Sequence, residues 1–107
     1  MAKRRAGWPT ARVALVAIGG LLLGEGVAAA DSAAGQRKSQ SCAVCHGPVG
    51  RATAPDAPHL AGQPELYLVA QLRNFRSGKR PHEVMGVIAK PLSDEDIADL
   101  AAFYSSL

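Results

Sequence analysis

Cysteine is scarce in this chain of 107 residues, and β-branched residues are few after residue 30. The only cysteines, Cys42 and Cys45, lie three positions apart, so a disulfide between them would stabilise the fold little. Alternating strand patterns are absent, while Ala, Leu and Gln are plentiful, which argues against a sheet and predicts an all-α domain. Domains of this size usually need a staple, and here a metal or cofactor is expected to supply it.

The first 30 residues differ in composition from the rest. An uncharged apolar run at 13–24 is preceded by basic residues and followed by small ones at 28–30. This order is typical of a secretory signal peptide, cleaved near Ala30. An uncleaved anchor is the alternative, but the run has only 12 residues, and a membrane span needs about 20. We therefore expect a signal peptide over 1–30 and one periplasmic domain over 31–107, with no membrane insertion after cleavage.

Net positive charge belongs to the signal segment. Residues 1–30 hold four of the 12 Lys and Arg residues and one of the nine Asp and Glu residues, so 31–107 retain eight of each. A domain of zero formal charge has no electrostatic basis for binding nucleic acid. Nucleic acid is therefore not expected as a partner.

Three helices are predicted in the domain, over about 32–43, over about 64–77, and from Ser93 onward. Asp31 or Ser32 caps the first, and Gly78 ends the second. The third combines a Ser cap and acidic first turn with an apolar stripe at Ile97, Leu100, Ala101 and Tyr104. The 17-residue loop at 47–63 contains three prolines and is unusually long for so small a domain unless it wraps something.

The sequence C-A-V-C-H at 42–46 is typical of c-type haem attachment. Two thiols three residues apart on a helical turn can each add to one haem vinyl group, and His46 then faces the iron. A thioredoxin-like pair would need a βαβ context, and a zinc site would need His59 or His82 as a fourth ligand. With the export signal, the motif favours one covalently attached haem c.

A second axial ligand is expected for the iron of an electron carrier. Met85 is the only methionine after residue 30 and lies 39 residues beyond His46, far enough to reach the opposite face. A methionine in that position raises the reduction potential. His82 is the alternative ligand, and Met85 is favoured.

The chain from Gly35 to Leu107 resembles a class I cytochrome c, in particular the small monohaem c553-type proteins and one half of a dihaem cytochrome c4. The matching segments are Gly35, CAVCHG at 42–47, PHLAGQ at 58–63, YLVAQLRNFRSGKR at 67–80, Met85 and LSDEDIADLAAFYSSL at 92–107. This resemblance implies the small all-α class I fold, with helices packed around one haem.

The resemblance also implies roles for individual residues. Cys42 and Cys45 would form the thioethers, His46 would be the proximal ligand and Met85 the distal one. The Pro58 carbonyl would accept a hydrogen bond from His46. Gly35 would permit close crossing of the first and last helices, against Leu100, Phe103 or Tyr104.

The implied function is one-electron transfer in a respiratory or related chain, without enzymatic activity. The partners would be a redox protein donor and acceptor, periplasmic or membrane-bound, and the chain a monomer or weak dimer. A haem subunit of a larger periplasmic oxidoreductase is one alternative. A ligand-binding or peroxidatic haem protein, which requires an open sixth position, is the other.

Overall fold

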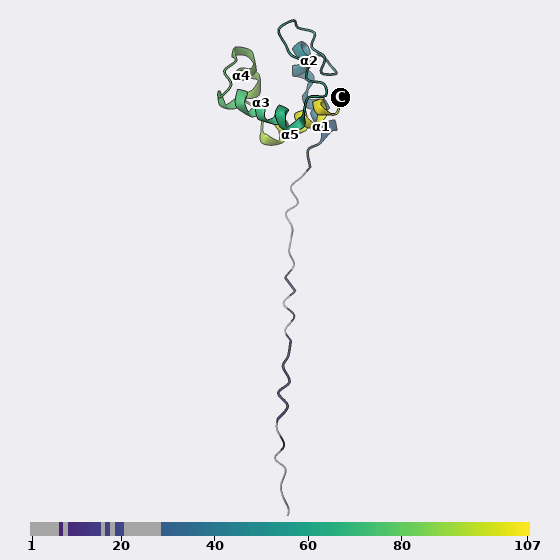
Figure 1. Cartoon of the computed structure of the whole chain (residues 1–107), viewed down its shortest axis with the longest axis vertical. Coiled ribbons are helices and arrows are strands. Elements are labelled where there is room, and N and C mark those ends of the chain that lie inside the picture. Colours follow the sequence, from purple (N-terminus) through teal and green to yellow (C-terminus); the bar gives the residue numbers. More distant parts are fainter. Residues whose placement is uncertain (1–6, 8, 16, 18, 21–28) are drawn as a thin grey trace, which may run out of the picture.

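A computed structural model describes residues 7, 9–15, 17, 19–20 and 29–107. Within these residues the elements are five helices: α1 (Ser32–Lys38), α2 (Gln40–His46), α3 (Glu65–Ser77), α4 (Glu83–Ala89) and α5 (Asp94–Ser105) (Figure 1). No strand occurs among the described residues, and the all-α prediction is confirmed. Residues 1–6, 8, 16, 18 and 21–28 of the predicted signal peptide at 1–30 lie outside the described residues.

The first predicted helix is two helices. Asp31 caps α1, as one of the two expected candidates, and its carboxylate accepts the Ala34 N–H at 3.1 Å. The helix is then interrupted at Ser39, whose buried hydroxyl donates to the Gln36 carbonyl at 2.8 Å. A serine that bonds a carbonyl of the preceding turn competes with the helical ladder and bends it. After this break, α2 continues to His46, three residues beyond the predicted end.

Helices α3 and α5 begin and end close to the predicted residues. Pro64 immediately precedes α3, and Gly78 ends it with φ of 80°, a conformation that glycine adopts without strain. Ser93 and Asp96 form a reciprocal capping box at the start of α5, with both hydrogen bonds at 3.0 Å. Local chemistry therefore determines these boundaries.

Helix α5 is the centre of the packing. Its predicted stripe is confirmed, because Ile97, Leu100, Ala101 and Tyr104 are all buried. Leu68 of α3 joins the core cluster, and α1 packs along α5. The crossing of α1 and α5 is closest at Gly35, where a Cβ would overlap the Asp99 carbonyl oxygen and lie 2.8 Å from the Phe103 Cβ. The expected close approach at Gly35 is thus present.

A polar clamp also joins α1 to α5. Lys38 of α1 contacts Asp99 at 2.7 Å and Asp96 at 2.8 Å, and Asp99 accepts the Asp31 N–H at 2.8 Å. These contacts raise the pKa of Lys38, lower that of Asp99, and lower the pKa of Asp96 to about 2. Buried Asp99 is therefore ionised and paired at neutral pH.

Helix α4 was missed by the sequence prediction, which placed three helices. It has seven residues and carries Met85. Its N-cap is His82, a residue type rarely expected there, and Gly86 lies in its interior. Pro81 and the acidic Glu83 in the first turn were the available signals, and both are weak.

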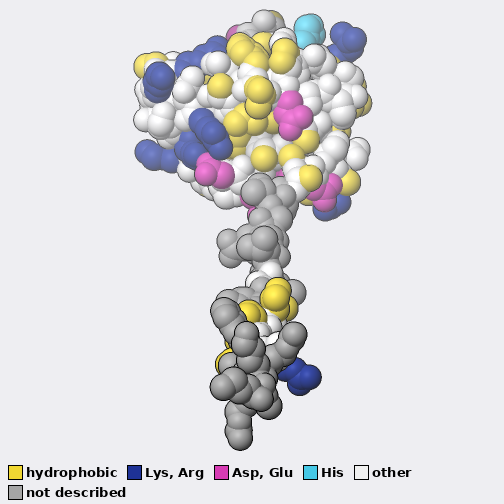
Figure 2. Space-filling model, turned by 60° about the horizontal axis from the view of Figure 1, so that its bottom comes forward, with side chains coloured by type: hydrophobic (Ala, Val, Ile, Leu, Met, Phe, Trp, Pro, Cys, Tyr) yellow, Lys and Arg dark blue, Asp and Glu magenta, His cyan; other side chains and the backbone are white. Residues whose placement is uncertain are grey.

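Charges of both signs are interspersed on the molecular surface, around hydrophobic side chains, on the face shown in Figure 2. This agrees with the balanced composition of residues 31–107. Among the described residues, no helix has the length and apolar character needed to cross a membrane.

Candidate functional site

Helix α2 delivers the C-x-x-C-H motif to one side of a cavity. Cys42 and Cys45 are separated by one helical turn and have free thiols. His46 ends the helix and is 7% exposed. Gly47 then turns the chain with φ of 77°, and a Cβ there would overlap the Arg51 carbonyl oxygen. The turn after the motif therefore requires glycine at this position.

The loop at 47–63 folds back on the motif. Its Thr53 and Ala54 amides donate to the Cys45 carbonyl at 3.0 and 3.2 Å. The loop places the Pro58 carbonyl 2.9 Å from His46 Nδ1, the contact implied by the resemblance. Because a carbonyl only accepts, Nδ1 carries the proton and Nε2 keeps its lone pair. The contact leaves Nε2 as the ring nitrogen that could bind a metal.

A cavity of about 520 Å³ lies between α2, the loop, α3, α4 and α5. Figure 1 shows α2 and α4 on opposite sides of the helical domain, with α3 and α5 between them. All five predicted site residues line this cavity, as do both alternative histidines. The lining comprises Cys42, Cys45, His46, Pro58, His59, His82 and Met85 together with mainly apolar side chains such as Leu60, Tyr67, Leu68, Leu72, Val84, Ile88 and Leu100.

These residues fit a covalently attached haem. The cavity has the size of a cofactor site, and its apolar walls suit a flat macrocycle. Helix α2 contributes two thiols that could bond the haem vinyl groups and an imidazole, and α4 contributes a thioether; an imidazole and a thioether are both ligands of haem iron. Tyr104 also lines this cavity, and among the described residues its hydroxyl is the buried side-chain polar atom without a hydrogen-bond partner. A polar edge or sulfur of a bound group would relieve that orphaned hydroxyl.

Burial favours the neutral forms of two side chains that line the cavity, those of Cys42 and Tyr104. Desolvation raises the pKa of the Cys42 thiol. It also raises the pKa of Tyr104 to about 12, with neighbouring Cys42 as the next cause. Both groups are therefore neutral at physiological pH.

In both alternative histidines, His59 and His82, Nδ1 already accepts a backbone hydrogen bond and is not free to bind a metal. His59 is exposed, and its Nδ1 accepts the Ala52 N–H at 2.8 Å. His82 Nδ1 accepts the Met85 N–H at 3.1 Å. Within the described part of the chain, no three His, Cys, Asp or Glu side chains gather as a metal site of their own. That arrangement differs from the four-ligand zinc site considered from the sequence.

Comparison with known proteins agrees with this geometry. A family model described as cytochrome c matches residues 32–107. Cytochrome c4 of Pseudomonas aeruginosa is 46% identical over 85 residues, which are 79% of this chain and 42% of that protein. Cytochrome c-554(548) of Halomonas halodenitrificans is 46% identical over 81 residues, covering 73% of this chain and 98% of that protein.

Two further matches concern a redox partner and a solved structure. A thiosulfate dehydrogenase electron acceptor of Thiomonas intermedia is 44% identical over 100 residues, covering 92% of this chain and 45% of that protein. The crystal structure of reduced cytochrome c4 from Pseudomonas stutzeri superposes with a TM-score of 0.69 at 41% identity, covering 73% of this chain and 46% of that one. The chain thus spans less than half the length of the curated cytochrome c4 relatives that it matches.

Proposed function

The chain belongs to the cytochrome c family, and from this premise we propose that it is a periplasmic monohaem carrier of single electrons. As a family member it is an electron-transfer haem protein with covalently bound haem c. The proposal adds the number of haems, the location and the ligands. One C-x-x-C-H sequence in the chain supports a single haem.

The shared cavity is the observation that carries the proposal, because it brings α2 and α4 to one site. Cys42 and Cys45 are the proposed thioether anchors, and His46 and Met85 the proposed axial ligands. When bound, haem c supplies an iron that alternates between two oxidation states. The Pro58 carbonyl holds the His46 ring and its tautomer. Met85 would supply a thioether sulfur to the iron, a ligand that raises the reduction potential.

Outer-sphere electron transfer needs little else from the protein. The apolar side chains of the cavity would exclude water from the haem and favour its less charged oxidation state. The ligands are held on helices, so few groups need to move when an electron enters or leaves. No catalytic acid, base or nucleophile is required.

The location and partners are inferred from the sequence and its relatives. Residues 1–30 have the order of a signal peptide cleaved near Ala30, and export would deliver residues 31–107 to the periplasm. One relative is named as the electron acceptor of a thiosulfate dehydrogenase. A periplasmic oxidoreductase is accordingly the proposed class of donor, with a second redox protein as acceptor.

Absorption spectra of the matured protein test the ligand proposal. The oxidised wild type should show the weak long-wavelength band of methionine ligation, and the reduced form should be low-spin and indifferent to carbon monoxide. Met85→Ala should abolish the band, admit carbon monoxide and lower the potential, with haem still attached. Val87→Ala is the matched control, since Val87 is on the same helix, 71% exposed, and outside the cavity. An unchanged spectrum in Met85→Ala would refute Met85 as ligand, and an open iron in the wild type would favour the ligand-binding alternative.

A further inference from the structure

Met85 is carried by a helix that has little to hold its first turn in place. Helix α4 has seven residues, and isolated helices of that length are unstable in water. Its last residue, Ala89, is fully buried, so packing fixes the C-terminal end. In the first turn, at the other end, Val84 is 56% exposed. The position of the first turn therefore depends on contacts other than core packing.

His82 supplies those contacts. Its backbone is extended, with φ of −158° and ψ of 127°, and its side chain caps α4. The capping bond runs from the Met85 N–H to His82 Nδ1 at 3.1 Å, so the cap is bonded to the very residue that faces the cavity. We propose that His82 is a positioning residue for Met85: it fixes the first turn of α4 and thereby holds the thioether toward the haem cavity. This inference rests on the proposed assignment of Met85 as distal ligand.

The ring of His82 is itself anchored to α3. It meets the ring of Phe75 edge-on, with centroids 5.8 Å apart and an interplanar angle of 78°. The Arg80 guanidinium lies 4.5 Å from the centroid of the same Phe75 ring and donates to Gln71 Oε1 at 2.8 Å. Phe75 is 9% exposed and is therefore a fixed support.

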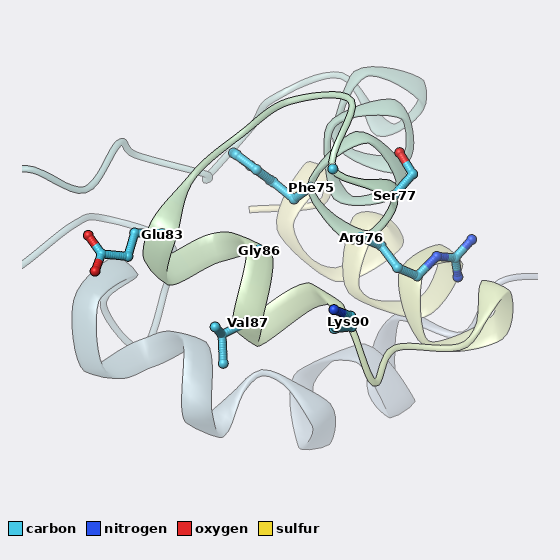
Figure 3. A pocket seen from close by; sticks show the side chains of 8 residues that line it. Phe75, Arg76, Ser77, Glu83, Gly86, Val87 and Lys90 are labelled. Atoms are coloured by element: carbon cyan, nitrogen blue, oxygen red, sulfur yellow. The ribbon is translucent and has the colours of Figure 1, made fainter.

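Phe75 stands between two hollows of the surface. It lines the haem cavity and also a shallower depression of about 370 Å³ between the end of α3 and α4. Figure 3 shows its side chain leaving α3 toward the turn where α4 begins at Glu83. The chain of contacts from α3 through Phe75 and His82 to the Met85 amide thus places the first turn of α4 relative to the cavity.

The experiment compares His82→Ala with His82→Asn in the haem-loaded protein. Asparagine is a strong N-cap whose amide oxygen can replace Nδ1 as acceptor, whereas alanine cannot cap. Imidazole is added to the oxidised protein, and loss of the long-wavelength band reports displacement of methionine. Alanine should lower the half-displacing imidazole concentration about fivefold, and asparagine should restore most of it.

Amide hydrogen exchange of Met85 in the reduced protein supplies a readout that does not involve ligand binding. The exchange rate should rise about fivefold in His82→Ala and return toward wild type in His82→Asn, while the Leu100 amide is unchanged. Ser93→Ala is the matched control, because it also removes an N-cap side chain, but from α5, and Ser93 does not line the haem cavity. It should leave both readouts of Met85 unchanged.

Each outcome decides between the two inferences. Wild-type imidazole sensitivity and Met85 exchange in His82→Ala would overturn the positioning role, while the band itself could still identify Met85 as ligand. Loss of the band in Met85→Ala, together with a half-displacing imidazole concentration that falls in His82→Ala and recovers in His82→Asn, supports both. If both His82 variants open the iron and Met85→Ala does not, His82 is the ligand, and both inferences are wrong.

Discussion

Gly35 offers the sharpest test of the packing that supports the site. It is the buried residue of α1 at the crossing with α5. A Cβ added there would overlap the Asp99 carbonyl oxygen and lie 2.6 Å from the Asp99 carbonyl carbon. These are backbone atoms of a helix, so no side-chain rotation can relieve the overlap. The two helices must separate to accommodate Gly35→Ala.

The expected loss follows from two opposing effects. Replacing glycine by alanine inside a helix stabilises it by about 0.5–1 kcal/mol. Overpacking of a well-packed contact costs about 1–3 kcal/mol, and the backbone overlap at Gly35 places it at the upper end. We therefore expect Gly35→Ala to lower the free energy of unfolding by about 2 kcal/mol. For a domain of this size that corresponds to a fall in Tm of about 8–16 °C.

Thermal unfolding of the haem-loaded protein, followed by circular dichroism, measures this difference. Gly86→Ala is the matched control, since Gly86 is also helical and an added Cβ would meet nothing within 4 Å. It has the same intrinsic gain without the overlap and should raise the free energy of unfolding by about 0.5–1 kcal/mol. If Gly35→Ala unfolds at or above the wild-type temperature, the proposed closeness of the α1–α5 crossing is wrong.

Three further predictions concern the clamp, a cap and the attachment site. Lys38 lowers the pKa of Asp96 to about 2 in the folded protein, against about 3.9 in the unfolded chain. The stabilisation of the folded state by this ion pair is therefore fully present above pH 4 and is lost as the pH falls through 2. The Tm difference between wild type and Lys38→Met should shrink over that range, and a constant difference would contradict the linkage. Ser93→Ala should lower the free energy of unfolding by about 1 kcal/mol in a denaturant titration. An unchanged free energy of unfolding would mean that the capping box does not stabilise the fold. Replacing Cys42 and Cys45 together by alanine should remove haem from the protein band in denaturing electrophoresis, and retained haem would refute the attachment site.

The fold was predictable where local chemistry determines it. The Ser93 capping box and the Gly78 stop are visible as residue patterns, and the structure begins α5 and ends α3 there. The break at Ser39 was not predictable, because it depends on a burial and a hydroxyl bond to Gln36 that arise only when α1 packs. Helix α4 was missed for a related reason: it is short, its N-cap is a histidine, and its support comes from Phe75 on another helix.

The candidate site was predictable in its parts and not in its arrangement. The C-x-x-C-H spacing and the single later methionine predicted the donors. His82 as a ligand and His82 as a cap could not be distinguished before the structure, since both roles need only a histidine near Met85. Only the geometry shows its Nδ1 occupied by the Met85 amide.

The cavity also explains how so small a domain can be stable. Its buried hydrophobic side chains are few and come largely from α5, namely Leu68, Phe75, Ala89, Ile97, Leu100, Ala101, Phe103 and Tyr104. Other apolar side chains, among them Tyr67 and Val84, line the cavity and are about half exposed. Burying them against a haem would extend the core from α5 to α4, whose first turn has little other packing. The haem that the sequence predicts as a stabilising cofactor would therefore also complete the hydrophobic core. It follows that the protein lacking both thioethers should lose the order of α4 before that of the α1–α5 pair, because that pair has its own contacts at Gly35 and Lys38.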